Sequence, residues 1–261
     1  MPTTDPAKKF QELLLNFSQA EDPDNRQHIE AELWKEYGVE RAVFVLDMSG
    51  FSLLTRKYGI VHYLSMVKRM QLTTKPIIKS YGGSMIKYEA DNCFAVFLDP
   101  LSAVNAGLAL QHAFEASNLM TSDDLDIYIS CGIDYGKILV IEGQDCFGDT
   151  VNRASKLGED LAAAGEVLVT KEAMYAIPPE AGIKARKMTV SISGINITAF
   201  SLSIKQESKQ TGAREHSKVV RKPRVRKPVS KREYPRYHST KRHAPWQLRA
   251  RPVLSSVLRP V

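Results

Sequence analysis

The stretch ERAVFVLDMSGF, residues 40–51, decides the fold. Its β-branched and aromatic residues predict a strand that ends abruptly at Asp47 and is followed by a Ser-Gly break. A carboxylate at a strand end, beside a turn of small residues, can hold a hard cation while the backbone N–H groups of the turn face phosphate oxygens. The same pattern is more often an ordinary turn or helix cap. The motif alone therefore leaves both interpretations open.

The segments around this strand alternate between helical and strand patterns. Apolar residues recur at helical spacing at 7–20 and 26–37, before the strand, and at 51–80, after it. The rest predicts, in order, a hairpin over 80–99 that turns near Ala90–Asp91, a helix over 100–118, two strands over 126–143 that turn at Tyr135–Gly136, a helix over 147–165, a strand at 166–170, a short helix at 171–177 and two strands around Gly194. This mixed order predicts an α+β or α/β fold with one central sheet and excludes a barrel or a Rossmann domain.

Charge is divided unevenly along the 261 residues. Residues 205–261 contain 17 of the 36 Lys and Arg but only 3 of the 29 Asp and Glu, a balance of +14. Residues 1–204 carry the other 19 basic and 26 acidic groups, a balance of −7. The net charge of +7 therefore describes neither part. A hydrophobic content of 43% excludes a wholly disordered or fibrous chain.

The basic tail, residues 205–261, alternates Lys and Arg with proline, as in RKPRVRKP and KREYPRY. It has too few large apolar residues to offset the entropy cost of ordering, so it is predicted to be disordered in isolation. A nucleic acid, an anionic membrane surface and an acidic protein are all suitable partners for such a tail. The pattern leaves these three open.

Cysteine usage and the N-terminus indicate the compartment. Three cysteines without CxxC spacing, and an N-terminus that is charged throughout, predict a reduced, cytoplasmic setting. No stretch approaches the roughly 20 apolar residues that a membrane span needs. We expect a cytoplasmic protein, with peripheral tethering through the basic tail as one option.

A second carboxylate, Asp91, lies at the predicted turn EADN, residues 89–92. Hairpin turns favour Asp for conformational reasons, so this residue also has a purely structural explanation. A pair of such carboxylates can instead bridge the ions of two-metal phosphoryl chemistry. Downstream, Asn152 and Lys156 are four residues apart and are predicted to share a helix face, where a donor and a cation could receive negative charge from a reacting phosphate.

Three segments, LDMSGF, IKYEADNCFAVF and DCFGDTVNRASKLGE, together resemble the catalytic domain of class III adenylyl/guanylyl cyclases, over approximately residues 41–204. The resemblance implies an α+β fold: a ferredoxin-like βαββαβ core sheet with helices packed on it. It divides the chain into an N-terminal helical preface at 1–38, a cyclase catalytic domain at 39–204 and the disordered tail at 205–261.

The resemblance also implies roles for the polar residues of these segments. Asp47 and Asp91 would bind two Mg²⁺ or Mn²⁺ ions, with the backbone carbonyl of Met48 completing one site. Lys87 and Asp145 would read the purine, because a lysine donor and a carboxylate acceptor suit the ring nitrogen and the amine of adenine. Guanine has an acceptor oxygen at the position of that amine and would leave Asp145 facing a like polarity.

Further groups would hold the sugar and the phosphates. By the same resemblance, Asn152 would orient the ribose, and Lys156 stands where the family usually has a transition-state arginine. The backbone N–H groups of Gly50, Phe51 and Ser52 would cradle the β- and γ-phosphates. The implied reaction is attack of the ribose 3′-oxygen on the α-phosphate of ATP, which forms 3′,5′-cyclic AMP and releases pyrophosphate. Because one domain supplies every type of group, the resemblance implies a homodimer with active sites at its interface.

Several residues depart from the family pattern and keep other interpretations open. Ala90 replaces the glycine that usually precedes the second carboxylate, which would strain the turn if its φ is positive. Lys156 lacks the forked geometry of arginine, and the closing strands lack a lysine-rich turn. An alignment shift of one residue would place Cys146 in the base pocket, as in enzymes that use GTP. The alternatives are thus a cyclase for GTP or a pyrimidine nucleotide, and a catalytically weakened module that binds nucleotide or a regulatory partner.

Overall fold

A computed structural model describes residues 5–192 and 195–204. The helices are α1 (Pro6–Gln19), α2 (Pro23–Tyr37), α3 (Phe51–Tyr58), α4 (Ile60–Ser80), α5 (Pro100–Asn118), α6 (Asp149–Ser155) and α7 (Lys171–Tyr175), with 3₁₀ turns η1 (Asp123–Leu125) and η3 (Pro179–Ala181) and a π-helical segment η2 (Lys156–Leu161). The strands are β1 (Gly38–Met48), β2 (Ser84–Glu89), β3 (Asn92–Phe97), β4 (Ile129–Ile141), β5 (Asp145–Phe147), β6 (Val167–Thr170), β7 (Ile183–Ile192) and β8 (Ile195–Ile204).

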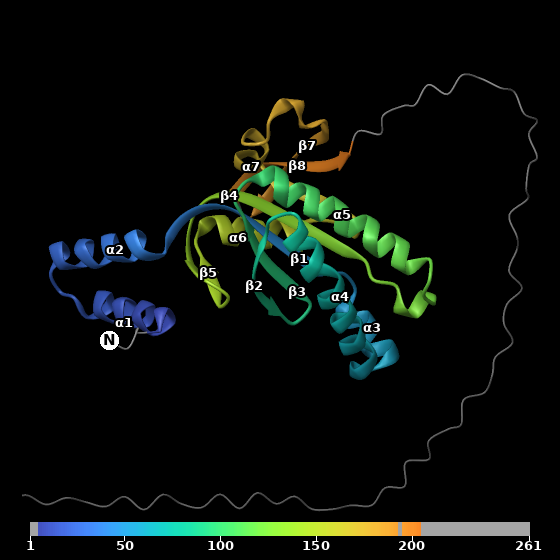
Figure 1. Cartoon of the computed structure of the whole chain (residues 1–261), viewed down its shortest axis with the longest axis horizontal. Helices are drawn as coiled ribbons and strands as arrows, with labels where there is room; N and C mark the ends of the chain where they lie inside the picture. The colour runs from blue at the N-terminus through green and yellow to red at the C-terminus, as the bar shows by residue number, and fades with distance from the viewer. Residues whose placement is uncertain (1–4, 193–194, 205–261) are drawn as a thin grey trace, which may run out of the picture. The chain divides into compact units, whose positions relative to one another are not determined.

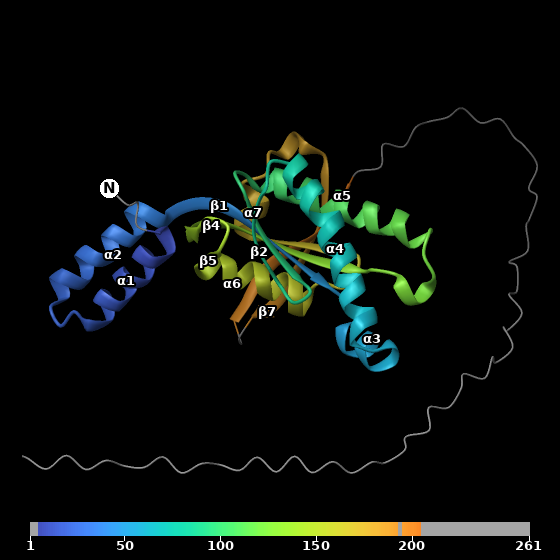
Figure 2. The same ribbon diagram turned by 60° about the horizontal axis from the view of Figure 1, so that its bottom comes forward.

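All eight strands join one sheet. Its order is β2-β3-β1-β4-β6-β8-β7, and β5 pairs with β4. Neighbouring strands are antiparallel except β4 and β6, which are parallel. Figures 1 and 2 show this sheet with helices against it. The single mixed sheet and its helices confirm the expected α+β class.

Strand β1 lies at the centre of the sheet and is buried on both faces. Residues 42–46 have no exposed surface. The even-numbered residues from Ala42 to Met48 belong to the large core under α4 and α5. The odd-numbered Val43 and Val45 join a second cluster with residues of α6, on the other face. This burial explains why the strand reads as a continuous apolar run.

Two glycines allow the segment α6–η2 to lie directly on the sheet. A side chain at Gly132 of β4 would meet the carbonyl oxygen of Ala154 at 2.1 Å and the backbone nitrogen of Gly158 at 2.3 Å. A side chain at Gly158 would in turn meet the carbonyl oxygen of Val45 at 2.8 Å. Only residues without Cβ permit this approach of two backbones. The segment is therefore held at a fixed depth on β1 and β4.

The N-terminal helices α1 and α2 both begin at an Asp-Pro pair. The side chains of Asp5 and Asp22 accept hydrogen bonds from the first-turn backbone N–H groups, and proline follows each cap. The two helices share a small core with Leu139 and Ile141 at the end of β4. Phe10 of α1 stacks on Phe147 of β5 with ring centroids 5.5 Å apart. The helical pair thus attaches to the β4–β5 end of the sheet.

The prediction of two strands that turn at Tyr135–Gly136 is wrong. Strand β4 continues through these residues and pairs with β1 from Ile129 to Leu139. A side chain at Gly136 would meet the hydroxyl oxygen of Thr150 at 2.8 Å. This glycine therefore allows α6 to pack closely on an unbroken strand. The residue that suggested a turn in the sequence is required by this packing.

Other expectations fall outside the described residues or concern the membrane. The turn at Gly194 and the tail at 205–261, with its predicted disorder and partners, lie outside them. Strands β7 and β8 pair over their whole length, as the sequence predicts. Among the helices that the structure describes, none has the length and apolar character of a bilayer span.

A buried carboxylate ties α6 to the sheet. Asp134 of β4 has no exposed surface and accepts hydrogen bonds from Nε of Arg153 at 2.7 Å, from the backbone N–H of Tyr135 at 2.8 Å and from the hydroxyl of Thr170. Burial raises the pKa of Asp134, and the Thr170 hydroxyl and the Arg153 charge oppose this rise. Asp134 of β4 is thus joined to α6 through Arg153 and to β6 through Thr170.

We predict that Arg153→Met lowers the free energy of unfolding at neutral pH by about 3 kcal/mol or more, because it leaves a buried carboxylate without its cation. The loss should shrink as the pH falls. A folded-state pKa above the unfolded value means that the folded chain takes up a proton first, so acidification stabilises it across that interval. Urea unfolding at pH 7.5 and pH 5 measures both effects.

Arg186→Met is the matched control, since Arg186 is exposed and only reaches Glu166 at 3.5 Å. It should change stability by less than about 1 kcal/mol at either pH. Equal losses in both variants, or an Arg153→Met deficit that grows on acidification, would contradict the assignment.

The turn between β2 and β3 carries backbone strain. Ala90 has φ of 51°, and among the described residues no other non-glycine residue has a positive φ. This region costs an L-residue roughly 1–2 kcal/mol because Cβ crowds the following carbonyl. The strain that the sequence suggested for this position is confirmed.

We expect Ala90→Gly to raise the free energy of unfolding by about 1 kcal/mol, because glycine removes the Cβ conflict at a modest entropy cost. Ala176→Gly makes the same chemical change at an exposed residue with φ of −84° and should lower stability. Thermal unfolding of the two variants checks the opposite signs. A shared sign would show that the turn is not strained.

Candidate active site

The first candidate group is Asp47, which β1 carries to the edge of the core. It follows the fully buried residues 42–46 and is itself half-buried. Burial raises its pKa to about 7, and the charges of Asp91 and Glu159 add to the rise. The ionised form is therefore costly in the protein alone. A cation beside Asp47 would remove this cost.

The second group, Asp91, is brought next to Asp47 by strand pairing. The register of β1 and β3 places Leu46 opposite Cys93, so the end of β1 faces the start of β3 and the turn before it. The negative charge of Asp91 adds to the effect of burial on the pKa of Asp47. The structure thus brings together the two carboxylates that the sequence named.

The chemistry of this pair fits a divalent cation. Within the described residues, neither Asp47 nor Asp91 forms an ion pair with a lysine or arginine. Two neighbouring carboxylates without a counter-charge are suitable oxygen ligands for Mg²⁺ or Mn²⁺. The described part of the chain has no cluster of three or more His, Cys, Asp and Glu side chains that could hold a metal. A bound ion would need further oxygen ligands from outside these side chains.

The turn after β1 places backbone groups beside the carboxylates. Ser49 donates its backbone N–H to the carbonyl of Tyr128 at 2.9 Å, which fixes the end of the strand. Gly50 has φ of 97°, a conformation that favours glycine, and begins α3 without a side-chain cap. The first N–H groups of α3, including those of Phe51 and Ser52, therefore lie at a helix N-terminus where anions are favoured. Of Met48, the side chain is buried in the core, which leaves its backbone carbonyl as the candidate ligand.

A second group forms where β2 meets β5. Nζ of Lys87 lies 3.1 Å from the carboxylate of Asp145 and 2.9 Å from that of Glu89, and it sits over the ring of Phe94 at 5.1 Å. Glu89 and Asp145 raise the pKa of Lys87, so it remains a cation. The backbone N–H of Cys146 donates to Asp145 at 2.8 Å. Lys87 and Asp145 thus form a donor–acceptor pair, as a base-reading site requires.

Cys146 points away from this pair. It is buried in the core cluster of Val43, Val45 and Ile86, whereas Asp145 is partly exposed. Burial raises the pKa of the Cys146 thiol to about 11. Successive side chains of a strand face opposite sides. In this geometry Asp145, and not Cys146, is the neighbour of Lys87.

Asn152 and Lys156 lie on α6 and at the start of η2. Asn152 is exposed, and Lys156 is half-exposed and paired with Asp160 at 2.6 Å. The helical register places them on one exposed side, as predicted. Among the described residues, no hydrogen bond or ion pair joins either of them to Lys87, Asp145, Asp47 or Asp91. One chain therefore shows separate groups and not a single closed site.

Two residues near the carboxylates were missed by sequence reasoning. Burial raises the pKa of Tyr63 on α4, and Asp91 adds to the rise. In the helical pattern at 51–80 it has the spacing of an ordinary apolar position. Glu159 of η2 lies close enough for its charge to raise the pKa of Asp47. Neither residue has a sequence signal that separates it from an ordinary helical position.

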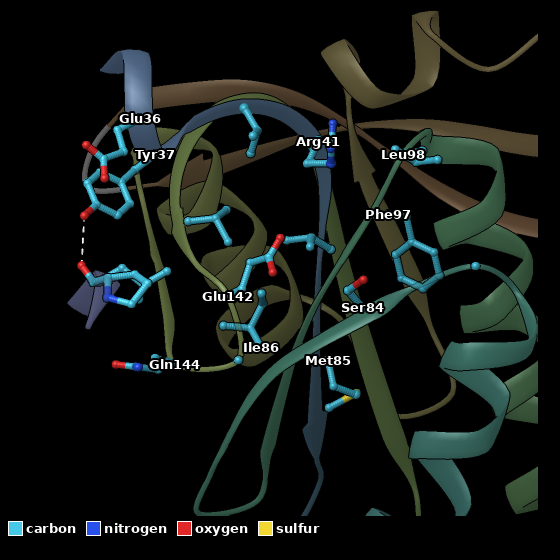
Figure 3. Close-up of a pocket in the computed structure, with 17 residues that line it drawn as sticks. Glu36, Tyr37, Arg41, Ser84, Met85, Ile86, Phe97, Leu98, Glu142 and Gln144 are labelled. Atoms are coloured by element: carbon cyan, nitrogen blue, oxygen red, sulfur yellow. Dashed lines mark hydrogen bonds between the residues drawn. The ribbon is translucent and has the colours of Figure 1, made fainter. Parts of the chain in front are cut away.

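The structure also has a cleft of about 900 Å³. Figure 3 shows Arg41 from β1, Ser84 and Ile86 from β2, and Glu142 beyond β4 at its walls, with Tyr37 of α2 at one end. None of the ten candidate residues lines it. The candidate site is thus defined by side-chain chemistry and not by the cleft.

Comparisons with known proteins agree with this fold. No family model matches the chain. A putative adenylate cyclase 3 from Rhizobium meliloti is 32% identical over 130 residues, which span 49% of this chain and 22% of that protein. The match therefore covers less than a quarter of that relative's length.

Solved structures match over a longer part of the chain. The adenylyl cyclase CyaB from P. aeruginosa is 20% identical with a TM-score of 0.57 over 65% of this chain and 97% of that one. The guanylyl cyclase Cya2 is 15% identical with the same TM-score, over 66% and 96%. Adenylyl and guanylyl cyclases thus share this fold. The described residues therefore have the fold of adenylyl and guanylyl cyclase catalytic domains.

Proposed function

We propose that this chain is an adenylate cyclase that forms 3′,5′-cyclic AMP and pyrophosphate from ATP. The observation that carries the proposal is the pair Asp47 and Asp91, neighbouring carboxylates that no lysine or arginine of the described residues neutralises, beside the N-terminus of α3. This arrangement suits a metal–triphosphate, which needs oxygen ligands for the metal and N–H donors for the phosphates. Relatives with cyclase names support the same reaction class.

In the proposed mechanism Asp47, Asp91 and the Met48 carbonyl hold two Mg²⁺ or Mn²⁺ ions. Such ions supply activation of the 3′-oxygen and neutralisation of the triphosphate. The N–H groups of Gly50, Phe51 and Ser52 bind the β- and γ-phosphates, and their fixed position lowers the entropy cost of alignment. The chain thereby presents the α-phosphate for in-line attack by the 3′-oxygen.

The remaining groups would act on the base, the ribose and the transition state. Lys87 donates to a ring nitrogen of adenine and Asp145 accepts from its amine, Asn152 orients the ribose, and Lys156 compensates charge on the α-phosphate. Lys156 must first leave Asp160, which costs little because an exposed pair contributes at most about 1 kcal/mol.

The active unit in this proposal is a homodimer. Among the described residues of one chain, Asn152 and Lys156 form no hydrogen bond or ion pair with Asp47 or Asp91. A two-fold dimer would let the carboxylates of one subunit meet Lys87, Asp145, Asn152 and Lys156 of the other, in two equivalent sites. Each subunit then supplies half of both sites.

Subunit mixing tests this arrangement. We expect Asp47→Ala to abolish cyclase activity and Asn152→Ala to reduce it severely, each as a homodimer. An equimolar mixture should recover roughly a quarter of the wild-type rate, because half of the dimers are mixed and each contains one intact site of two. Cyclic AMP formation from ATP with Mn²⁺ is the readout, with GTP, CTP and UTP assayed in parallel.

The control is a mixture of Asp47→Ala with Asp91→Ala, which should stay inactive because both changes fall in the same half-site. Activity of the mixed Asp47→Ala and Asn152→Ala dimers no higher than that of the parents, with exchange verified, would reject the shared site. A dimeric wild-type protein that cyclises none of the four nucleotides would reject the enzyme.

Base recognition gives a separate prediction. Asp145→Asn should reduce the preference for ATP over GTP by about tenfold or more, because an amide can donate to the guanine oxygen that a carboxylate repels. Cys146→Ala, a change at the adjacent buried residue, should leave the preference unchanged. Ratios of kcat/KM for the two nucleotides measure the effect. If Cys146→Ala changes the nucleotide preference and Asp145→Asn does not, the base is read from the Cys146 side of β5 and the assignment of Asp145 is wrong.

A further inference from the structure

A third charged residue, Glu89, belongs to the group that Lys87 and Asp145 form. Lys87 and Glu89 are two positions apart on β2, so their side chains stand on the same face of the strand. Nζ of Lys87 lies 2.9 Å from the carboxylate of Glu89 and 3.1 Å from that of Asp145. One ammonium group therefore bridges two carboxylates, one on its own strand and one on β5.

The position of Lys87 is constrained on several sides. Its Nζ lies 5.1 Å from the centre of the Phe94 ring, which belongs to the core cluster that α6 shares. An ammonium group has three N–H donors, so two can serve Glu89 and Asp145 while one remains for a ligand. The side chain of Lys87 is 29% exposed, which keeps this remaining donor accessible.

Asp145 likewise keeps one oxygen for a ligand. Its Oδ1 receives both the ammonium group of Lys87 and the backbone N–H of Cys146, the latter at 2.8 Å. The pairing of β5 with β4 fixes its backbone, with Asp145 opposite Ile141. Oδ2 is then the acceptor that a base would meet. Lys87 and Asp145 thus present one donor and one acceptor side by side.

The order of this donor and acceptor decides which purine fits. Adenine has a ring nitrogen that accepts beside an amine that donates, whereas guanine has a ring N–H that donates beside an oxygen that accepts. A lysine that could swing across Asp145 would also match guanine, because its stem is flexible and its donors have no fixed geometry. The ion pair with Glu89 holds the ammonium group on the β2 side of Asp145. Only the order that suits adenine is then available.

We propose that Glu89 is a specificity-determining residue, which anchors Lys87 and thereby selects adenine over guanine nucleotides. The proposal rests on the proposed function, in which Lys87 and Asp145 read the base, and it names the group that fixes the lysine. Glu89 acts through Lys87 and does not contact the base, so it is a positioning residue. Its side chain is 65% exposed, and substitutions there should leave the fold intact.

Equilibrium binding of 3′-deoxy-ATP and 3′-deoxy-GTP in the presence of Mn²⁺ tests the proposal, because neither nucleotide has the oxygen that would attack. Isothermal titration calorimetry gives both dissociation constants for the full-length wild type, Glu89→Ala, Glu89→Gln and Glu142→Ala. Glu142→Ala is the matched control. It removes an exposed carboxylate three residues before Asp145 that is not among those that Lys87 contacts.

The ratio of the two dissociation constants is the decisive quantity. We expect the wild type to prefer 3′-deoxy-ATP and Glu89→Ala to reduce this preference roughly fivefold, the effect of losing one ion pair with an exposed partner. Glu89→Gln should shift the ratio in the same direction by less, because its amide oxygen still accepts from Lys87. It carries the test if Glu89→Ala does not fold. Glu142→Ala should keep the wild-type ratio. A change in overall charge acts equally on both triphosphates and cancels in the ratio.

The outcomes separate the proposal from the function on which it rests. A wild-type ratio in Glu89→Ala, with the preference lost in Asp145→Asn, overturns the role of Glu89 and leaves the base-reading pair intact. Equal shifts in Glu89→Ala and Glu142→Ala also overturn it. A wild type that does not prefer 3′-deoxy-ATP overturns both the base-reading assignment and the role of Glu89. The expected ratios in a protein that cyclises no nucleotide would support the role of Glu89 and reject the enzyme.

Discussion

The burial of β1 on both faces is the constraint on which the rest of the structure depends. Residues 42–46 are closed off by α4 and α5 on one side and by α6 on the other, so no polar side chain fits there. Asp47 is the first residue at which a charge can approach solvent. The carboxylate therefore stands at the boundary of the core, where it is desolvated enough to favour a cation and open enough to receive one.

Close packing on the sheet also positions the segment that carries Asn152 and Lys156, the groups proposed to act on the ribose and the α-phosphate. Gly132 and Gly158 let α6–η2 lie on β4 and β1 at backbone contact, and Arg153 secures the helix to the buried Asp134. The π-helical segment begins at Lys156, and such segments often occur at functional positions. The depth of this helix thus sets how far its exposed side chains stand from the sheet.

The sequence predicted the parts of the site that follow from local pattern. The apolar run that ends at Asp47 and the hairpin that presents Asp91 are visible as alternations of residue type, and the strain at Ala90 could be anticipated because glycine was missing at a tight turn. The contact of Lys87 with Asp145 could be anticipated only from a family resemblance, since β5 has three residues and no periodicity.

Other features depend on three-dimensional contacts that no local pattern records. Gly136 is a residue type that is typical of turns, yet it lies within β4. It is glycine because Thr150 of α6 packs closely against it. Tyr63 fits an apolar helical stripe through its ring, and only the folded chain shows where its hydroxyl ends. An analysis of periodicity therefore misses residues such as tyrosine, whose side chain is largely apolar but ends in a polar atom.

The stacking of Phe10 on Phe147 has a consequence for the order of folding. The two rings are 137 positions apart in the chain, whereas α1 and α2 are neighbours that can form a helical pair from local contacts. During synthesis this pair leaves the ribosome long before β4 and β5 exist to receive it. The part of its apolar surface that packs on Leu139, Ile141 and Phe147 stays exposed to solvent until the middle of the domain has been made. The first helices of the chain are thus among the last to be secured.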